Sequence, residues 1–477
     1  MKKMKKQSFS KTLKSLMDEY GIKNAVLANE LQYDESYISK WINGKSLPSK
    51  KNARPVITRI ADYIAGAETE YSPEGAGSGE ELRQTVYEEL MKAYNDDESA
   101  SSGEKQSDSY HPLMTQHAFF DEVRDIRSDE DVALIDIFSL EHDVRLSVAG
   151  IENGYFIYEK PDKERKLSLT ISIDLLEEDK EKIVYDSVFL IHMLTSLSNI
   201  DLRLYENDIA AGKIIYVNRN RNYISGMIFP DDGIACVYAG SNRECADLLS
   251  ETVNHAANSE RLVCEKTTMK DMLATKKYIH SLISVKVKWL MGHYTELLIP
   301  EDVFEEILDD NRIGDKEIYK ESHIVTNLTT GHNNTELLIY ESAISKLAIT
   351  GELDFYNTKI ILNPKQREKC ILHLKNLIED NPDNFTCKLI DRGFSPDFQY
   401  ITNPCLFISD SVYYLRLENG RYDDNICVIQ NEKTKKMFER FFRVIWSDKE
   451  DNVISDRTQI LKHIDYYISS MKIIEKT

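Results

Sequence analysis

The sequence predicts a multidomain protein: a small all-α domain at the N-terminus, a flexible linker and then a large mixed α/β region. Three observations carry this prediction. Apolar residues recur at helical spacing over residues 8–65, Gly, Ser and acidic residues dominate 66–112, and runs rich in β-branched residues alternate with helical patterns from about residue 117. The chain of 477 residues is long enough for about three domains. We therefore predict an N-terminal domain at 1–66, a linker at 67–115, and α/β domains at 116–265 and 266–477.

The N-terminal domain is organised around two short helices in residues 24–45. Leu27 and Leu31 fall four residues apart, and Ile38 and Trp41 recur three apart after a break. This spacing predicts two helices that share one small core.

Local signals define the second of these helices. Asp34 is placed to cap its N-terminus, because its carboxylate can accept from free amides of the first turn. Gly44 is placed to end it in a left-handed conformation, and Pro48 prevents it from resuming. Short polar side chains on a short capped helix suit a DNA major groove.

Other helices are predicted on either side of this pair. Phe9–Tyr20 should form the first helix, which Gly21 stops, and Pro55–Ile64 should form the last one of the domain. Within the linker, Glu81–Tyr94 could form a helix whose apolar stripe either pairs with its twin in a dimer or is only marginally stable.

The segment LANELQYDESYISKWINGKSLP resembles the helix-turn-helix of phage repressor and Cro proteins, the XRE family. The family's Leu-Ala step falls on Leu27 and Ala28, and its terminal Asn-Gly-basic sequence falls on 43–45. The resemblance covers about residues 8–65. It implies binding of double-stranded DNA, with base-reading positions at Glu35, Ser36, Ser39 and Lys40 and phosphate-contacting positions at Asn43 and Lys45.

Two residues depart from the family pattern. Gln32 stands where the turn usually has Gly, so a residue with a Cβ must adopt a left-handed conformation. Glu35 replaces a common amide; its carboxylate can accept from cytosine but is repelled by phosphate. The base-by-base roles therefore stay open, as do two other interpretations of the helix pair: an ordinary helical hairpin and a protein-contact surface.

Charge is divided unequally along the chain. Residues 1–66 carry 13 Lys and Arg against 6 Asp and Glu, a net of +7, and the rest carries 47 against 74, a net of -27, giving the total of -20. Such a chain would bring only its N-terminal domain to a polyanion. With no long apolar run and no apolar segment behind the basic start, we expect a cytoplasmic protein without membrane contact.

The α/β region predicts alternating strands and helices. Strands are expected at 131–140, 167–175 and 200–206, with a buried crossover helix at Glu181–Leu197. A hairpin is expected at 223–240. Further helices are expected at 241–258, 268–291, 431–446 and 457–473, and further strands at 402–409, 411–417 and 425–430.

Chemical motifs are weak in this region. The seven Cys are scattered without a CxxC pair, and no His pair has metal-ligand spacing, so we predict no metal and no cofactor. His373, Lys375 and Asp380 fit the HxKxxxxD pattern of the phospholipase D superfamily, but apolar residues at helical spacing surround them, which favours coincidence. The pentapeptide TELLI occurs at 295 and again at 335, which chance explains about as well as duplication.

The resemblance therefore implies a sequence-specific DNA-binding transcriptional regulator, not an enzyme. We expect a homodimer whose α/β region supplies dimerisation and senses a small-molecule or protein effector. Two alternatives remain open: an enzyme on nucleic acid or nucleotides delivered to DNA by its N-terminal domain, and an interaction or defence module that grips a protein with it.

Overall fold

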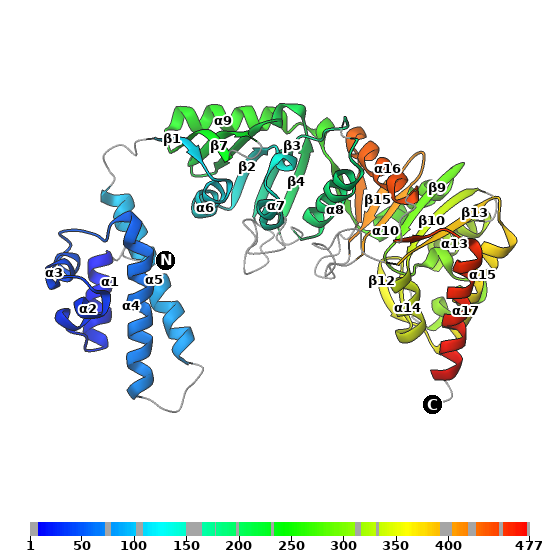
Figure 1. Ribbon diagram of the computed structural model, residues 1–477, viewed down its shortest axis with the longest axis horizontal. Coiled ribbons are helices and arrows are strands. Elements are labelled where there is room, and N and C mark those ends of the chain that lie inside the picture. The colour runs from blue at the N-terminus through cyan, green and yellow to red at the C-terminus, as the bar shows by residue number, and fades with distance from the viewer. Residues whose placement is uncertain are drawn as a thin grey trace. The chain divides into compact units, whose positions relative to one another are not determined.

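The computed structural model separates the chain into two compact units, residues 1–107 and residues 108–477, called here the first unit and the body (Figure 1). The first unit is helical and the body is mixed α/β, as predicted. The structure describes residues 8–71, 78–101, 108–148, 165–176, 178–196, 200–229, 233–310, 316–330, 333–391, 403–417, 426–447 and 452–474.

The described part of the first unit forms a bundle around one apolar core. Phe9 and Leu13 of the first helix are fully buried, and Ser8 caps this helix by accepting from the Lys11 amide. Leu27, Ile38 and residues of the later helices join the same core. The helices are α1 (Phe9–Glu19), α2 (Asn24–Leu31), α3 (Glu35–Ile42), α4 (Lys50–Tyr71) and α5 (Ser78–Ser101).

The last two helices differ from the prediction. Helix α4 begins at Lys50 rather than Pro55 because Ala53 already packs in the core at helical spacing from Val56. Helix α5 was expected in a linker at 67–115, yet its Val86 and Leu90 are buried in the core of the same unit.

Tyr94 fixes the C-terminal part of α5 to the bundle. Its hydroxyl donates to the Pro48 carbonyl at 3.0 Å, and its ring meets Phe9 edge-on at 5.8 Å between centroids. The apolar stripe of α5 therefore packs within the first unit, and the boundary between the first unit and the body lies between residues 107 and 108.

The first half of the described body contains a seven-stranded sheet of order β1-β7-β6-β5-β2-β3-β4. Strands β2, β3 and β4 are parallel, and the others are antiparallel to their neighbours. Figure 1 shows α9 on one face and α6, α7 and α8 on the other. The elements are β1 (Ser109–Met114), α6 (Gln116–Ile126), β2 (Glu130–Ile135), α7 (His142–Val148), β3 (Lys166–Ile171), α8 (Lys180–Ser196), β4 (Asp201–Glu206), β5 (Lys213–Asn218), β6 (Tyr223–Phe229), β7 (Gly233–Gly240) and α9 (Arg243–Ala256).

These elements confirm most predictions for this half. Helix α8 joins the parallel strands β3 and β4, as expected of a crossover. Strands β6 and β7 form the expected hairpin, although residues 231 and 232 of its turn lie outside the described residues. The expected strand at 131–140 stops at Ile135, because the chain turns into a 3-10 segment at 137–139.

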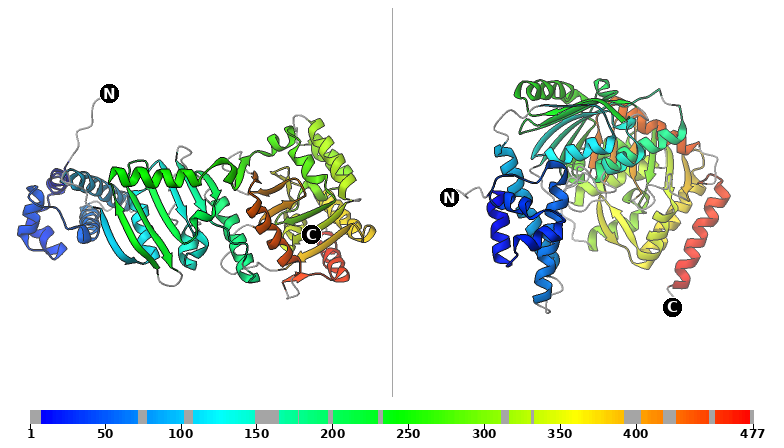
Figure 2. Two further views of the ribbon diagram at one scale, coloured as in Figure 1. Left: turned by 90° about the horizontal axis from the view of Figure 1, so that it is seen from above. Right: turned by 60° about the vertical axis from the view of Figure 1, so that its left-hand side comes forward.

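The second half contains an eight-stranded sheet of order β17-β13-β10-β9-β14-β15-β16-β8 in the described residues. Helices surround it (Figure 2). The strands are β8 (Cys264–Thr267), β9 (Lys286–Met291), β10 (Asn334–Tyr340), β13 (Phe385–Ile390), β14 (Cys405–Ile408), β15 (Tyr413–Arg416), β16 (Ile426–Ile429) and β17 (Val453–Ile454). The helices are α10 (Met269–Ala274), α11 (Lys277–Leu282), α12 (Glu301–Asp310), α13 (Lys316–Thr330), α14 (Glu341–Thr350), α15 (Pro364–Asp380), α16 (Glu432–Trp446) and α17 (Arg457–Ile474).

The two sheets repeat one topology. In each sheet, an opening strand is followed along the chain by three parallel strands, which helical crossovers join, and then by three antiparallel strands. The opening strand pairs with the last of these antiparallel strands. Strands β1 to β7 correspond in chain order to β8, β9, β10, β13, β14, β15 and β16. We call residues 109–256 the first repeat and 264–446 the second repeat. The predicted boundary at 265/266 is wrong, because it cuts strand β8.

One helix predicted for the second repeat is also wrong. The range 268–291 contains α10, α11 and then strand β9. Strand β9 lies between β10 and β14, and Val287 and Leu290 are buried. At its start, Lys286 and Lys288 alternate with buried Val287, and only its second half is continuously apolar and buried. Pairing with β10 and β14 therefore decides its conformation.

The TELLI pentapeptide forms no structural repeat. At 295–299 it forms a 3-10 segment that Thr295 caps, whereas at 335–339 it lies in strand β10. Five shared residues therefore adopt two conformations set by their different neighbours. Among the described helices, none has the length and apolarity needed to cross a membrane.

Candidate nucleic-acid interface

Helix α3 has one buried and one exposed face. Ile38 is fully buried and Trp41 is 2% exposed, and both pack in the core of the first unit. The six residues predicted to contact DNA lie together on this helix or at its C-terminal end. Glu35, Ser36, Lys40, Asn43 and Lys45 are exposed, and Ser39 is half-buried.

The turn before α3 has the geometry that the sequence predicts. Gln32 is left-handed, with φ 58° and ψ 41°, and its amide donates to the carbonyls of α2. The conformation strains a residue with a Cβ, but it directs the chain sharply into the next helix. The Asp34 carboxylate accepts from the Ser36 amide at 2.9 Å, which confirms the predicted cap.

The cap also holds a negative charge at the start of α3. Hydrogen bonds from the side chain of Ser36, and then from its backbone, lower the pKa of Asp34 below its ordinary value. Asp34 therefore stays ionised at neutral pH, and Glu35 adds a second carboxylate beside it. Any DNA must approach this end of the helix through base edges that donate hydrogen bonds rather than through phosphates.

The C-terminal end of α3 is closed by its own residues. The Asn43 side-chain amide donates to the Ser39 carbonyl at 2.7 Å, so its nitrogen is already engaged. Gly44 is left-handed, with φ 65°, and its amide donates to the Trp41 carbonyl. Lys45 follows this turn with its side chain exposed, which leaves its ammonium available for a phosphate.

Helix α4 holds the helix pair from behind. Arg59 donates to the last carbonyls of α2, at 2.5 Å to Glu30 and 3.2 Å to Leu31. The ring centroid of Tyr33 lies 5.3 Å from that of Trp41, so the turn packs on the buried face of α3. The exposed face is thus presented on a fixed support.

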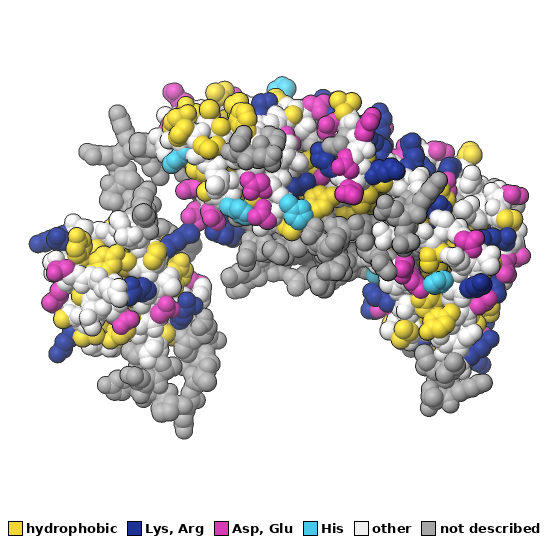
Figure 3. Space-filling model, viewed as in Figure 1, with side chains coloured by type: hydrophobic (Ala, Val, Ile, Leu, Met, Phe, Trp, Pro, Cys, Tyr) yellow, Lys and Arg dark blue, Asp and Glu magenta, His cyan; other side chains and the backbone are white. Residues whose placement is uncertain are grey.

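Tyr37 is a surface residue that the sequence analysis missed. Its side chain is 48% exposed on α3, its ring meets Tyr33 at 5.8 Å, and the Lys40 ammonium lies 5.3 Å from its centroid. Tyr37 precedes Trp41 by four residues, so a helical wheel places it beside the buried stripe of α3, and its exposure could not be read from the spacing. In Figure 3, basic and acidic side chains both appear over the region that Figure 1 labels α3.

The phospholipase-like motif is placed on one helix. His373, Lys375 and Asp380 all lie on α15, as the helical spacing predicts. Lys375 pairs with Asp465 of α17 at 2.7 Å, and Asp380 is exposed. This helical setting differs from the strand on which the family carries its His and Lys, so the motif supports no phosphodiesterase site.

One group of metal-ligand type occurs among the described residues. His117, Glu141 and Asp143 are close enough to hold one ion, but all three are exposed. His117 hydrogen-bonds directly to Asp143 at 2.7 Å, and this contact lowers the pKa of Asp143. Two of the three candidate ligand groups therefore already contact each other.

Comparison with known proteins does not assign the chain to a family. No protein-family model matches the chain, and no curated protein matches it in sequence.

Proposed function

We propose that this protein is a sequence-specific DNA-binding transcriptional regulator of the cytoplasm. In this proposal α3 enters the major groove of double-stranded DNA as the recognition helix of a helix-turn-helix. The observation that carries it is the exposed polar face of a short capped helix, held by buried Ile38 and Trp41 behind a left-handed turn.

Charge supports the same use of residues 1–66, whereas the acidic segment 67–107 brings the whole first unit to 16 Lys and Arg against 17 Asp and Glu, a net of -1. Residues 1–66 carry a net of +7 and the remaining chain a net of -27. DNA is attracted to the first and repelled by the second, which favours docking through α3.

The side chains on α3 have distinct chemistry toward DNA. The Lys40 ammonium can donate to guanine, the Glu35 carboxylate can accept from cytosine, and Ser36 and Ser39 can pair with either kind of group. Lys45 is placed to contact a phosphate, where it strengthens binding without reading sequence.

Specific binding requires two copies of α3. The helix has eight residues, so it spans about 12 Å and reaches only a few base pairs. A homodimer would present two such helices to half-sites one helical turn apart, and the body would supply dimerisation and the effector signal. Palindromic binding sites are the signature of this arrangement.

Selection of binding sites from random duplex DNA, followed by fluorescence anisotropy, tests the proposal. We expect Lys40→Ala to reduce the preference for the selected site over random DNA by about 5- to 150-fold, as expected for one lost base contact. Lys45→Ala should weaken binding to both DNAs equally and reduce the slope of log K against log salt by about 1. Lys92→Ala is the matched control, because Lys92 is exposed on α5 and is not among the six residues predicted to contact DNA.

Genome-wide mapping of binding sites extends the test to the host. Sharp palindromic peaks that disappear in a Lys40→Ala, Asn43→Ala variant would support a dimeric regulator. A flat profile, together with selection that enriches no sequence, would overturn the proposal and favour an enzymatic or protein-binding role.

A further inference from the structure

The second repeat carries an inserted ribbon. Strands β11 (Glu352–Phe355) and β12 (Thr358–Ile361) lie between α14 and α15, on the connection from β10 to β13. At the equivalent connection, from β3 to β4, the described residues of the first repeat contain helix α8 and no such ribbon. Because the topology forms without it in one repeat, the ribbon serves something other than the shared fold.

The ribbon docks at the carboxyl end of strand β9. The Asp354 amide donates to the Tyr294 carbonyl at 2.9 Å, and the Tyr356 amide donates to the Glu296 carboxylate at 3.0 Å. Its turn holds two non-glycine residues, Tyr356 and Asn357, with φ of 49° and 62°. Ligands of α/β sheets are commonly bound at the carboxyl ends of parallel strands.

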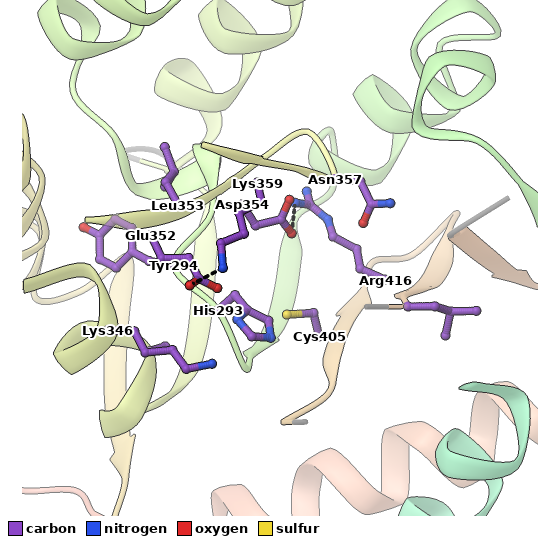
Figure 4. A pocket seen from close by; sticks show the side chains of 12 residues that line it. His293, Tyr294, Lys346, Glu352, Leu353, Asp354, Asn357, Lys359, Cys405 and Arg416 are labelled. Carbon is purple, nitrogen blue, oxygen red and sulfur yellow. Dashed lines mark hydrogen bonds and ion pairs between the residues drawn. The ribbon is translucent and has the colours of Figure 1, made fainter. Parts of the chain in front are cut away.

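A cavity of about 370 Å³ lies between the ribbon and the sheet (Figure 4). This volume is in the range of small-molecule sites. Charged side chains of both signs line it, and three of them come from the ribbon. The charged lining residues are Lys346, Glu352, Asp354, Lys359 and Arg416.

A buried charge network forms the floor of the cavity. The Arg416 guanidinium donates to both oxygens of Glu296, at 2.9 and 2.5 Å, and to Asp354 Oδ2 at 3.1 Å. Tyr278 donates its hydroxyl to the same Glu296 carboxylate. Glu296 is therefore fully satisfied, whereas Asp354 receives only one contact from this guanidinium.

Two polar atoms of the floor lack partners. Asp354 Oδ1 and Arg416 Nε are both buried, and neither makes a hydrogen bond within the described part of the chain. The Arg416 side chain is only 2% exposed. Buried donors and acceptors are normally paired, so the open acceptor of Asp354, a residue that lines the cavity, points to a bound molecule that donates to it.

The mouth of the cavity adds one uncompensated cation. Lys359 pairs with Glu352 at 2.5 Å, but exposed Lys346 makes no ion pair with any described residue. Figure 4 shows Lys346 and Asp354 on opposite sides of His293. The open positions of the pocket are thus an anionic one at Asp354 and a cationic one at Lys346.

We propose that this pocket binds a small zwitterion of the α-amino acid class. Its ammonium contacts Asp354 Oδ1, and its carboxylate contacts the Lys346 ammonium. A ligand with both charges can meet both open positions, whereas a simple anion or cation satisfies only one of them. The ligand would be the effector of the body, so its regulatory meaning rests on the proposed function, but its binding does not.

The burial of the Asp354 carboxylate favours a cationic ligand group beside it. Burial raises the pKa of Asp354 above its ordinary value, and the charge of Arg416 offsets that effect only in part. An ammonium beside the carboxylate would replace the lost hydration of the charged form.

The test is binding of single amino acids to the full chain without DNA. Each of the common amino acids is screened by thermal shift, and those that stabilise the protein are measured by calorimetry. Ethylamine and acetate serve as probes that carry one charge only. We expect at least one amino acid to bind, and to bind at least tenfold more tightly than either probe.

Variants connect this binding to the pocket. Asp354→Asn and Lys346→Gln should each weaken the binding at least tenfold, while Lys462→Gln, on the exposed face of α17, should leave it unchanged. Lys346 is exposed, so its variant tests the pocket even if Asp354→Asn folds poorly. The proposal is overturned if no amino acid binds, if Lys346→Gln binds like wild type, or if acetate binds as well as the amino acids. DNA binding is measured separately, so failure of either proposal is recognised by itself.

Discussion

Replacing Arg416 by Met should destabilise the body strongly. Arg416 is the only cation that contacts the Glu296 carboxylate in the described residues, and the Glu296 side chain is fully buried. Met keeps most of the apolar volume but removes the charge, so Glu296 and Asp354 are left as uncompensated buried carboxylates. Breaking a buried ion pair in this way costs about 3–5 kcal/mol of unfolding free energy.

The loss of unfolding free energy caused by Arg416→Met should grow as pH rises. In the wild type, burial raises the pKa of Glu296, but the charge of Arg416 and the hydrogen bonds to the carboxylate outweigh it, so the net pKa lies below its ordinary value. Glu296 therefore contributes stability above its unfolded pKa of about 4, and this is lost as pH falls. Without Arg416 burial dominates and raises the pKa, so the same group favours folding at low pH and opposes it as pH rises.

Urea unfolding of the full chain from about pH 5.5 to 8 measures this dependence. Two of the three Trp, Trp289 and Trp446, lie in the body, so a Trp41→Phe background limits the fluorescence signal to this unit. Arg443→Met is the control, because Arg443 is 66% exposed and its loss should cost at most about 0.5 kcal/mol.

Adding Glu296→Gln to Arg416→Met should recover part of the stability and flatten the pH dependence, because one buried charge is removed. The reasoning fails if Arg416→Met costs no more than Arg443→Met, or if the loss is independent of pH.

Three further outcomes are expected. Gln32→Gly should stabilise the first unit by up to about 1 kcal/mol, because Gly relieves about 1–2 kcal/mol of left-handed strain at some entropic cost. Urea unfolding followed by Trp41 fluorescence measures this change, and a loss of stability would contradict it. Leu90→Ala should cost about 2–5 kcal/mol in the same assay, since Leu90 is fully buried in that unit, and an unchanged curve would contradict the packing of α5. Of the seven thiols, only exposed Cys236 and Cys245 should react quickly with Ellman's reagent in the native protein, because the others are buried; rapid reaction of more than two would show that the buried set is accessible.

The sequence predicted the local features of the candidate interface correctly. The cap at Asp34, the left-handed Gln32 and the end of α3 at Gly44 all depend on residues within a few positions of one another. Such features are determined by short-range sterics and hydrogen bonds, which a sequence displays directly. The exposed face of α3 follows from the spacing of Ile38 and Trp41.

Several elements could not be predicted in this way. The apolar stripe of α5 indicated a helix but not its partner, which proved to be the core of its own unit. Strand β9 follows two short helices within a range predicted as one helix, and it is a strand because β10 and β14 flank it. Tyr37 lies at helical spacing from buried Trp41, so its exposure depends on the packing of the bundle and not on the pattern.

The sequence by itself determined the helical first unit, the charge difference between residues 1–66 and the rest of the chain, and the surface that α3 presents. Only the tertiary structure decided the repeated sheet topology, the inserted ribbon and the pocket beneath it. Glu296 and Arg416 lie 120 residues apart in the chain, and each alone has the appearance of an ordinary surface charge. Which charges are buried together depends on strand order and register, and these follow from the packing of the whole body rather than from any local pattern.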